Sequence, residues 1–390
     1  MIYNESKYNT SWETQKLSDL GVFSRGVSKH RPRNDPRLFT GGGYPLVQTG
    51  EIKEANLFIT KHTQEYGEFG LQQSRLWDAG TLCITIAANI AETAILSYPM
   101  CFPDSVVGFQ ANKAVSSEMF MYYVFDYIRT AIQGAATGSA QDNINIEYLT
   151  SLEFKIPCKE YQDKIVGIIS LLDRMILKNE QINDNLAAQM RAYFKEYTAN
   201  NASITGKLKD YSVMQYGYTE TATTEPVGPK FLRITDIAQN YIDWNGVPYC
   251  PISEGNHEKY VLSEGDVVVA RTGATVGYAK MVGRNIPDSV FASFLVRIRP
   301  IDDEYRYYFG LAITSSEFLD FVQTNAGGSA QPQANPPLLG EFELSIPNKQ
   351  SLPEFNTKIS SFLGVIESNE TEISKLHEVK DTMVKMLSSR

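Results

Sequence analysis

Apolar residues recur at alternating steps of three and four in two separate stretches of the chain. The first seam is Ile165, Ile168, Leu172, Met175, Asn179, Ile182 and Leu186, and the second is Phe355, Ile359, Phe362, Ile366, Asn369, Ile373 and Leu376. This period is typical of a coiled coil rather than of one globular helix face. We expect two long helices that pair as an antiparallel coiled coil. The asparagine in each seam either fixes the register of the pair or lies at a polar helix edge.

Strand patterns occupy the regions before each of these helices. Short runs rich in β-branched residues, Leu82–Ile86 and Val267–Ala270, each follow a glycine turn, and such runs predict buried strands. The chain therefore alternates strand-rich and helical regions, and we expect a mixed α+β fold.

Four sequence words occur twice in the same order, which indicates a tandem duplication. Residues 46–52 recur as 231–237, 80–84 as 265–269, 138–141 as 328–331, and 154–157 as 344–347. The repeat predicts four segments: a strand-rich domain in 1–157, a central helix in 158–200, a second strand-rich domain in 201–347, and a terminal helix in 348–390. For the Gly-Ser-Ala-Gln word at 138–141 and 328–331 we expect an architectural or partner-docking role.

Composition limits the class of protein. With 43% hydrophobic and 21% charged residues, the chain resembles soluble globular proteins. No apolar run is long enough for a transmembrane helix and no signal peptide is evident, so we expect a cytoplasmic protein. The four cysteines form no CxxC pair, and we expect reduced structural thiols without a metal site. The net charge of −9 argues against a simple basic DNA-binding protein, because phosphate neutralisation normally supplies non-specific affinity.

Catalytic motifs are incomplete throughout the sequence. Asn335-Pro336-Pro337-Leu338 imitates the base-gripping loop of adenine methyltransferases but lacks its stacking aromatic, and no glycine-rich cofactor loop follows a strand. Thr205-Gly206-Lys207-Leu208 is not a Walker loop. Glu51, Lys53 and Asp35 are the nearest approach to a nuclease site, and we interpret them as surface charge. No catalytic residue is expected in this chain.

The sequence resembles the specificity subunits of type I restriction-modification enzymes across nearly its whole length. The resemblance rests on Trp12-Glu13 with Lys16–Leu20, on Tyr44–Val47, on Gly80–Asn89, on Gly265–Gly277 and on Gly328–Gln331. It implies two target-recognition domains, each reading one half of a bipartite site in double-stranded DNA. The helices between them would dock two methyltransferase subunits and set the half-site spacing.

The resemblance also implies which chemistry belongs to partner subunits. Methylation with S-adenosylmethionine would reside in the methyltransferase subunits, and ATP- and magnesium-dependent cleavage in endonuclease or translocase subunits. The alternative is a non-catalytic coiled-coil scaffold that does not bind DNA directly, and it explains the negative charge more easily. A gel shift in the presence of the methyltransferase would separate the two hypotheses.

Candidate DNA-binding residues lie in loops that differ between the two repeats. The basic stretch Ser24–Arg33 suits a loop that follows phosphates while an arginine reaches a guanine edge, and its counterpart Gln215–Thr219 is neutral and aromatic. After each central strand, Ala87–Asn89 and Arg271–Gly273 are expected at matching positions. The candidates are Arg25, Lys29, His30, Arg31, Arg33, Arg75, Asn89, Gln215, Tyr216, Tyr218, Lys230, Arg233, Arg271 and Thr272.

Overall fold

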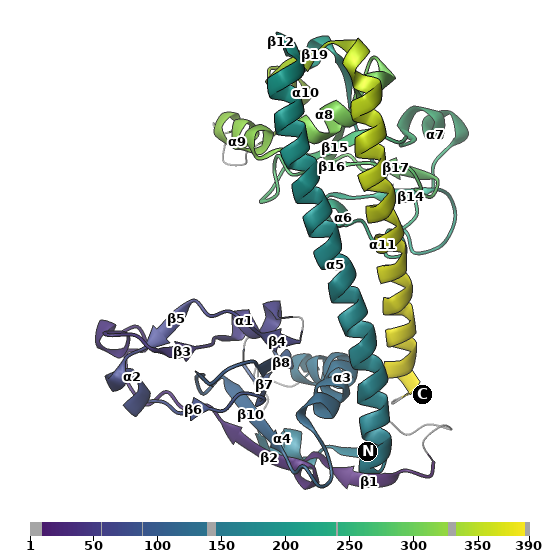
Figure 1. Cartoon of the computed structure of the whole chain (residues 1–390). Coiled ribbons are helices and arrows are strands. Elements are labelled where there is room, and N and C mark those ends of the chain that lie inside the picture. Colours follow the sequence, from purple (N-terminus) through teal and green to yellow (C-terminus); the bar gives the residue numbers. More distant parts are fainter. Residues whose placement is uncertain are drawn as a thin grey trace. The chain divides into compact units, whose positions relative to one another are not determined.

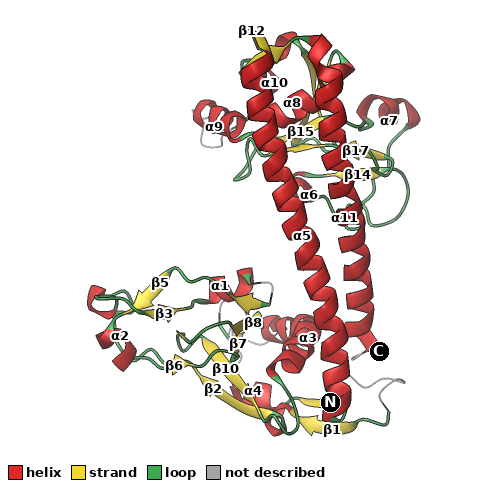
Figure 2. Ribbon diagram, viewed as in Figure 1, coloured by secondary structure: helices red, strands yellow, loops and turns green. Residues whose placement is uncertain are grey.

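The computed structural model of the chain forms two compact units (Figure 1). It describes residues 10–55, 57–87, 89–138, 146–238, 241–326 and 333–386. Unit 1 comprises residues 1–174 and 377–390, and unit 2 comprises residues 175–376. Strands and helices occur in both units, as Figure 2 shows, which confirms the mixed α+β class. The limits of the four expected segments remain a prediction.

Unit 1 is built on two mixed sheets and a separate strand pair. The larger sheet has the order β2-β10-β7-β8-β4, the smaller has the order β5-β3-β9-β6, and β1 pairs with β11. The strands are β1 (Glu13–Lys16), β2 (Gly21–Arg25), β3 (Tyr44–Leu46), β4 (Phe58–Ile59), β5 (Gln64–Tyr66), β6 (Leu76–Trp77), β7 (Leu82–Thr85), β8 (Thr93–Leu96), β9 (Met100–Cys101), β10 (Val106–Ala111) and β11 (Glu153–Ile156).

Helix α3 (Glu118–Gly138) covers the larger sheet of unit 1 and closes its main core (Figure 1). Phe120 and Phe125 of this helix pack in one buried cluster with Leu82 of β7 and Phe109 of β10. The shorter helices of the unit are α1 (Thr49–Glu54), α2 (Glu68–Gln72) and α4 (Ile146–Ser151). Since all four residues of β7 are buried and the strand lies in the middle of its sheet, the prediction of a central strand within Leu82–Ile86 is confirmed.

Unit 2 repeats this plan with fewer strands. Strands β13-β18-β15-β16 form a sheet, β12 pairs with β19, and β14 runs parallel to β17. The strands are β12 (Ala202–Lys207), β13 (Ser212–Tyr216), β14 (Lys230–Leu232), β15 (Val267–Ala270), β16 (Ala279–Met281), β17 (Ser289–Phe291), β18 (Leu295–Pro300) and β19 (Glu343–Pro347). The shorter helices are α6 (Ile234–Ile237), α7 (Glu254–Tyr260), α8 (Arg306–Ile313), α9 (Ser316–Asn325) and α10 (Pro336–Gly340).

Hydrogen-bond registers show that the sequence duplication is also a structural one. Arg25 of β2 lies opposite Val107 of β10, as Tyr216 of β13 lies opposite Val296 of β18. The turn before the central strand also recurs, because Gly80 and Gly265 have φ angles of 84° and 85°, a conformation that favours glycine. The Gly-Ser-Ala-Gln words at 138–141 and 328–331 lie outside the described residues, except for Gly138 at the end of α3.

A recurring cap begins the helix after β3 in unit 1 and after β14 in unit 2. Glu51 Oε2 accepts from the backbone N–H of Gln48 at 2.7 Å, and Asp236 Oδ2 accepts from that of Arg233 at 2.8 Å. An acid three residues into a helix that bonds back to the capping residue satisfies a backbone donor left free by the helix. The word at 46–52 and 231–237 therefore encodes a strand followed by a capped helix.

Two long helices, α5 (Lys159–Asn201) and α11 (Leu352–Met386), follow the strand-rich regions. Within unit 2 they pair in antiparallel fashion, since Tyr197 packs on Phe355 with ring centroids 4.4 Å apart, while Asn183 bonds Asn369 further along both helices. Within unit 1, Lys380 Nζ lies 2.7 Å from Asp173 Oδ1. Among the described residues, neither these helices nor any other combines the length and hydrophobicity needed to cross a bilayer.

The predicted seam of α11 is confirmed, but that of α5 is wrong at two positions. Ile168 and Met175 are 50% and 38% exposed, whereas the next residues, Ile169 and Ile176, are 0% and 6% exposed. The buried positions fall on one seven-residue frame, at Gln162, Ile169, Ile176, Met190 and Tyr197, and the half-buried Asn183 occupies the same frame between Ile176 and Met190. Both members of each Ile-Ile or Met-Ile pair are apolar, so periodicity alone could not choose between them.

Of the two seam asparagines, Asn369 forms a hydrogen bond across the helices, and its partner is Asn183, which the sequence analysis did not single out. Asn369 Nδ2 donates to Asn183 Oδ1 at 2.8 Å. Asn179 is half-buried, and its Nδ2 is buried without a hydrogen-bond partner among the described residues. Asn183 and Asn369 thus provide the polar contact that can fix register.

Candidate nucleic-acid interface

Two glycines place corresponding side chains at the ends of the edge strands β2 and β13. The N–H of Gly26 donates to Val106 O at 2.8 Å, and that of Gly217 to Leu295 O at 3.1 Å. A Cβ on either glycine would lie 2.2 or 2.1 Å from a backbone carbonyl oxygen, so a side chain is excluded at both. The residues before them, Arg25 and Tyr216, are therefore fixed in matching, exposed positions.

The basic loop after β2 is held by Asp104, which lies in the turn between β9 and β10. Arg33 donates to Asp104 Oδ1 at 2.6 Å, and Arg31 to Asp104 Oδ2 at 3.5 Å. Arg31 also donates to Ser28 O at 2.6 Å. The side chains of both arginines stay more than half exposed, at 54% and 52%, so their guanidinium groups lie at the surface together.

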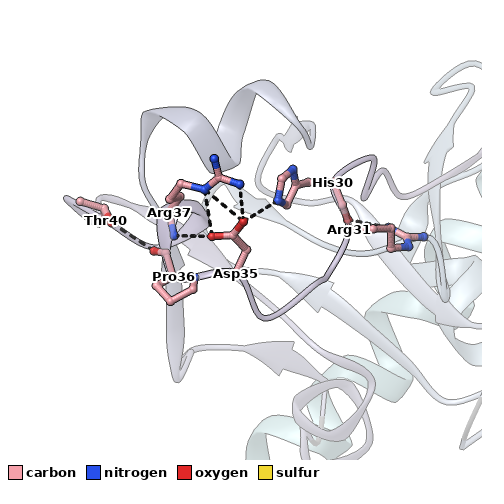
Figure 3. Close-up of polar contacts among 6 residues, drawn as sticks. All are labelled: His30, Arg31, Asp35, Pro36, Arg37 and Thr40. Atoms are coloured by element: carbon pink, nitrogen blue, oxygen red, sulfur yellow. Dashed lines mark hydrogen bonds and ion pairs between the residues drawn. The ribbon is translucent and has the colours of Figure 1, made fainter.

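A second acid, Asp35, organises the next part of this loop (Figure 3). Its carboxylate contacts His30 Nε2 at 2.8 Å, accepts from Arg37 Nη2 at 2.7 Å, and accepts from the backbone N–H of Arg37 at 3.0 Å. Bonds from Arg37 and His30 hold the pKa of Asp35 well below its usual range, and the same pairing raises the pKa of Arg37. The sequence analysis missed Arg37, although its side chain is 70% exposed beside the predicted stretch.

Three further candidates of unit 1 lie in different surroundings. Lys29 donates its backbone N–H to Gln73 O at 3.0 Å and is exposed. The guanidinium of Arg75 lies over the ring of Trp77, 3.8 Å from its centroid. This cation–π contact stabilises the position of the arginine. Asn89 has a φ angle of 39° and accepts from Lys53 at 3.5 Å.

Arg271 is the centre of the corresponding region in unit 2. Its guanidinium lies 4.7 Å from the ring centroid of Tyr216 and donates to Ser293 O at 3.4 Å. Phe294, in the same turn as Ser293, is 58% exposed, and it was not predicted. Thr272 forms an isolated bridge with Gln333. An arginine stacked on an exposed aromatic ring suits contact with phosphates or with base edges.

The predicted match between Ala87–Asn89 and Arg271–Gly273 is wrong by one residue. Arg271 N–H donates to Phe294 O, and the counterpart of that bond in unit 1 runs from Ile86 N–H to Ser105 O, both at 3.0 Å. Ile86 is 2% exposed, so the place that Arg271 occupies in unit 2 is apolar in unit 1. The repeat of residues 80–84 as 265–269 already places Ile86 at the position of Arg271, so the predicted match was one residue out of step with the repeat itself.

The remaining candidates of unit 2 make contacts within the domain. Gln215 accepts from the buried Arg297, and Tyr218 packs on Tyr260 with ring centroids 5.2 Å apart. Lys230 donates to Val247 O at 2.7 Å. Arg233 donates from Nη2 to Asp236 Oδ1 at 2.8 Å as part of the cap of α6, and this pairing raises its pKa.

The residues that imitate catalytic motifs have local structural roles. Asn335 caps α10, because its Oδ1 accepts from the N–H of Leu338 at 2.9 Å. All four cysteines are unpaired, and three of them are buried. Across the described ranges, no three His, Cys, Asp or Glu side chains come together in a way that could hold a metal ion.

Comparison with known proteins identifies relatives along most of the chain. A family model described as "Type I restriction modification DNA specificity domain" matches residues 9–188 and 222–380. The MjaVIII specificity subunit of a type I restriction enzyme from Methanocaldococcus jannaschii is 20% identical over 404 residues, covering 96% of this chain and 92% of the relative. The MjaIX specificity subunit of the same organism is 22% identical over 196 residues, covering 49% of this chain and 44% of the relative.

A solved structure shares the fold of the whole chain. The crystal structure of a type I restriction-modification system S subunit from M. genitalium has a TM-score of 0.58 and 14% sequence identity, and the match covers 100% of both chains. At this identity the likeness concerns the arrangement of strands and helices alone.

Proposed function

Because the chain belongs to the family of type I restriction-modification DNA specificity domains, we propose that it reads a bipartite site in double-stranded DNA. Each strand-rich domain reads one half of the site. The observation that carries this proposal is that one backbone is present twice, with different side-chain chemistry at matching positions. Arg25 in unit 1 stands where Tyr216 stands in unit 2, and Ile86 where Arg271 stands. Two different half-sites require such a difference.

Base contacts are assigned to the side chains that remain accessible at these positions. In unit 1 these are Arg25, Lys29, Arg31 and Arg33, and in unit 2 Tyr216 and Arg271. Arginine is suited to bidentate contact with guanine and to phosphate contact. Arg75 and Asn89 are candidates of the same kind. Lys230, Arg233 and Gln215 are weaker candidates, because DNA would have to displace their bonds to Val247, Asp236 and Arg297.

The long helices are proposed as the docking site of two methyltransferase subunits and as the element that sets the half-site spacing. Near the start of α5, Tyr161, Ile168 and Leu171 form one exposed apolar strip, at 49%, 50% and 50% exposure. Their spacing of seven and three residues places them on one helix face. Contiguous exposed apolar surface of this kind is typical of protein interfaces. A partner helix with a complementary apolar face would bury the strip.

Catalysis is assigned to partner subunits within this proposal. The methyltransferase subunits use S-adenosylmethionine, and endonuclease or translocase subunits use ATP and magnesium. The chain itself supplies DNA recognition and assembly in the cytoplasm. The net charge of −9 favours the alternative of a scaffold that does not bind DNA directly, since non-specific DNA affinity depends on positive charge.

A binding experiment with the assembled complex separates the two functions. We expect Arg31→Ala and Arg271→Ala to weaken DNA binding, and one of them to relax base choice by about 1–3 kcal/mol. Lys113→Ala is a matched control, because it removes a 72% exposed positive charge beyond the end of β10 that lies opposite the Asp104 turn. A complex that assembles with the methyltransferase but binds no DNA would establish the scaffold function instead.

A further inference from the structure

Asp104 is the acid that both exposed arginines of the basic loop contact, although it lies about 70 residues away along the chain. Its carboxylate is 32% exposed and is contacted by Arg31 at Oδ2 and by Arg33 at Oδ1. DNA phosphates bind arginine through the same guanidinium N–H groups. A phosphate that approaches either arginine therefore competes with Asp104 for donors and is repelled by its charge.

The corresponding turn of unit 2 has no acid. The N–H of Val106 donates to Pro103 O and that of Leu295 to Ala292 O, both closing the turn with one bond. Ser293 thus stands at the position of Asp104. Among the described residues, the guanidinium of Arg271, beside this turn, contacts the carbonyl oxygen of Ser293 and the ring of Tyr216, and no carboxylate. The two domains present arginines beside the same turn, and one domain restrains them with a carboxylate.

We propose that Asp104 restrains Arg31 and Arg33 and so lowers the affinity of the first domain for DNA of any sequence, while Ser293 places no carboxylate beside Arg271. This inference rests on the proposed DNA contact of the basic loop. A specificity subunit benefits from the restraint, because genomic DNA offers a large excess of non-specific sites. Contacts made at the correct half-site compensate for the broken ion pairs, whereas phosphate contacts alone do so less well.

The test measures binding of the full-length chain, assembled with its methyltransferase subunits, to a DNA duplex of mixed sequence. Asp104→Asn is expected to bind this duplex about 2- to 5-fold more tightly, the range for loss of an exposed ion pair. The plot of log affinity against log salt should steepen by about 1 for each additional phosphate that a released arginine neutralises. Ser293→Asp should do the reverse in unit 2, with weaker binding and a shallower slope.

Glu341→Gln is the matched control for net charge. Glu341 also accepts from two cations, Lys207 and Lys209, and its carboxylate is 45% exposed, but it lies beside the β12–β19 pair. Its replacement removes the same charge and frees two cations outside the proposed interface. We expect its binding to stay close to that of the wild type.

The possible results distinguish failure of the proposed restraint from failure of the proposed DNA contact. If Arg31→Ala combined with Arg33→Ala weakens binding while Asp104→Asn leaves it unchanged or weaker, the restraint is refuted and the DNA contact stands. An increase in affinity with Glu341→Gln equal to that with Asp104→Asn would show a net-charge effect and also refute the restraint. If removal of both arginines has no effect, the loop does not contact DNA, and the proposed role of the loop fails with the inference.

Discussion

The hydrogen bond between Asn183 and Asn369 provides a direct test of helix pairing within unit 2. Asn369 Nδ2 donates to Asn183 Oδ1 at 2.8 Å, and both side chains are half-buried. Replacing one asparagine with leucine leaves the other amide opposite an apolar side chain. A buried polar group without a partner costs about 1–3 kcal/mol. Because water reaches part of this site, we expect each single variant to lose about 1 kcal/mol of unfolding free energy.

Replacing both asparagines removes both polar groups and lets two leucines pack across the helices. The double variant should therefore be as stable as the wild type, or up to about 1.5 kcal/mol more stable. The double-mutant cycle then gives a coupling of about 2–3.5 kcal/mol between the positions. Such a value would identify the amide pair as a specificity device rather than a source of stability.

Denaturant unfolding of the full-length chain measures these differences, and Trp244 is the tryptophan that lies in unit 2. Asn185→Leu is a suitable control, since it makes the same chemical change at an exposed position of α5; it should alter stability by no more than about 0.5 kcal/mol. Single effects that add up to the double effect within about 0.5 kcal/mol would refute the pairing of the two amides.

Four further outcomes are expected. Asn179→Leu should raise the unfolding free energy of unit 2 by about 1 kcal/mol, because it removes a buried amide N–H without a partner. Burial raises the pKa of Glu370 to about 7, so its folded form binds a proton more tightly than its unfolded form. Stability should then fall from pH 5 to 7, by at most about 3 kcal/mol, a trend that Glu370→Gln abolishes in unfolding measurements. Replacing residues 1–157 by the matching domain of a relative should change one half-site only, as methylation mapping would show. Adding one heptad to each long helix beside the asparagine pair lengthens both by about 10 Å, or about three base pairs of DNA, and should lengthen the spacer without altering the half-sites.

The duplicated plan could be predicted from the sequence because its words encode local backbone requirements. Gly80 and Gly265 adopt the same left-handed turn, and Glu51 and Asp236 form the same helix cap. Each requirement is satisfied by residues close together in the chain. Sequence comparison within the chain was therefore enough to predict two strand-rich regions and the helices that follow them.

The features that the sequence left open depend on contacts between distant residues. Nothing near Arg31 and Arg33 in the chain indicates that Asp104 receives them, since the turn between β9 and β10 brings them together. Likewise, Ile168 and Ile169 are equally apolar, and only the packing of α5 decides that the second is buried. The sequence also predicted which loops carry candidate DNA contacts, but not which of their side chains stay exposed and which pack within the domain.

The central claim is that this chain reads two half-sites through two copies of one fold. Mapping methylated bases across the genome of cells that carry the chain and its methyltransferase tests it most directly. We expect one split motif, with two short specific halves, a spacer of fixed length and a methylated adenine in each half, which disappears when the chain is deleted. A methylation pattern that persists without this chain, or a motif that is short and continuous, would contradict the claim.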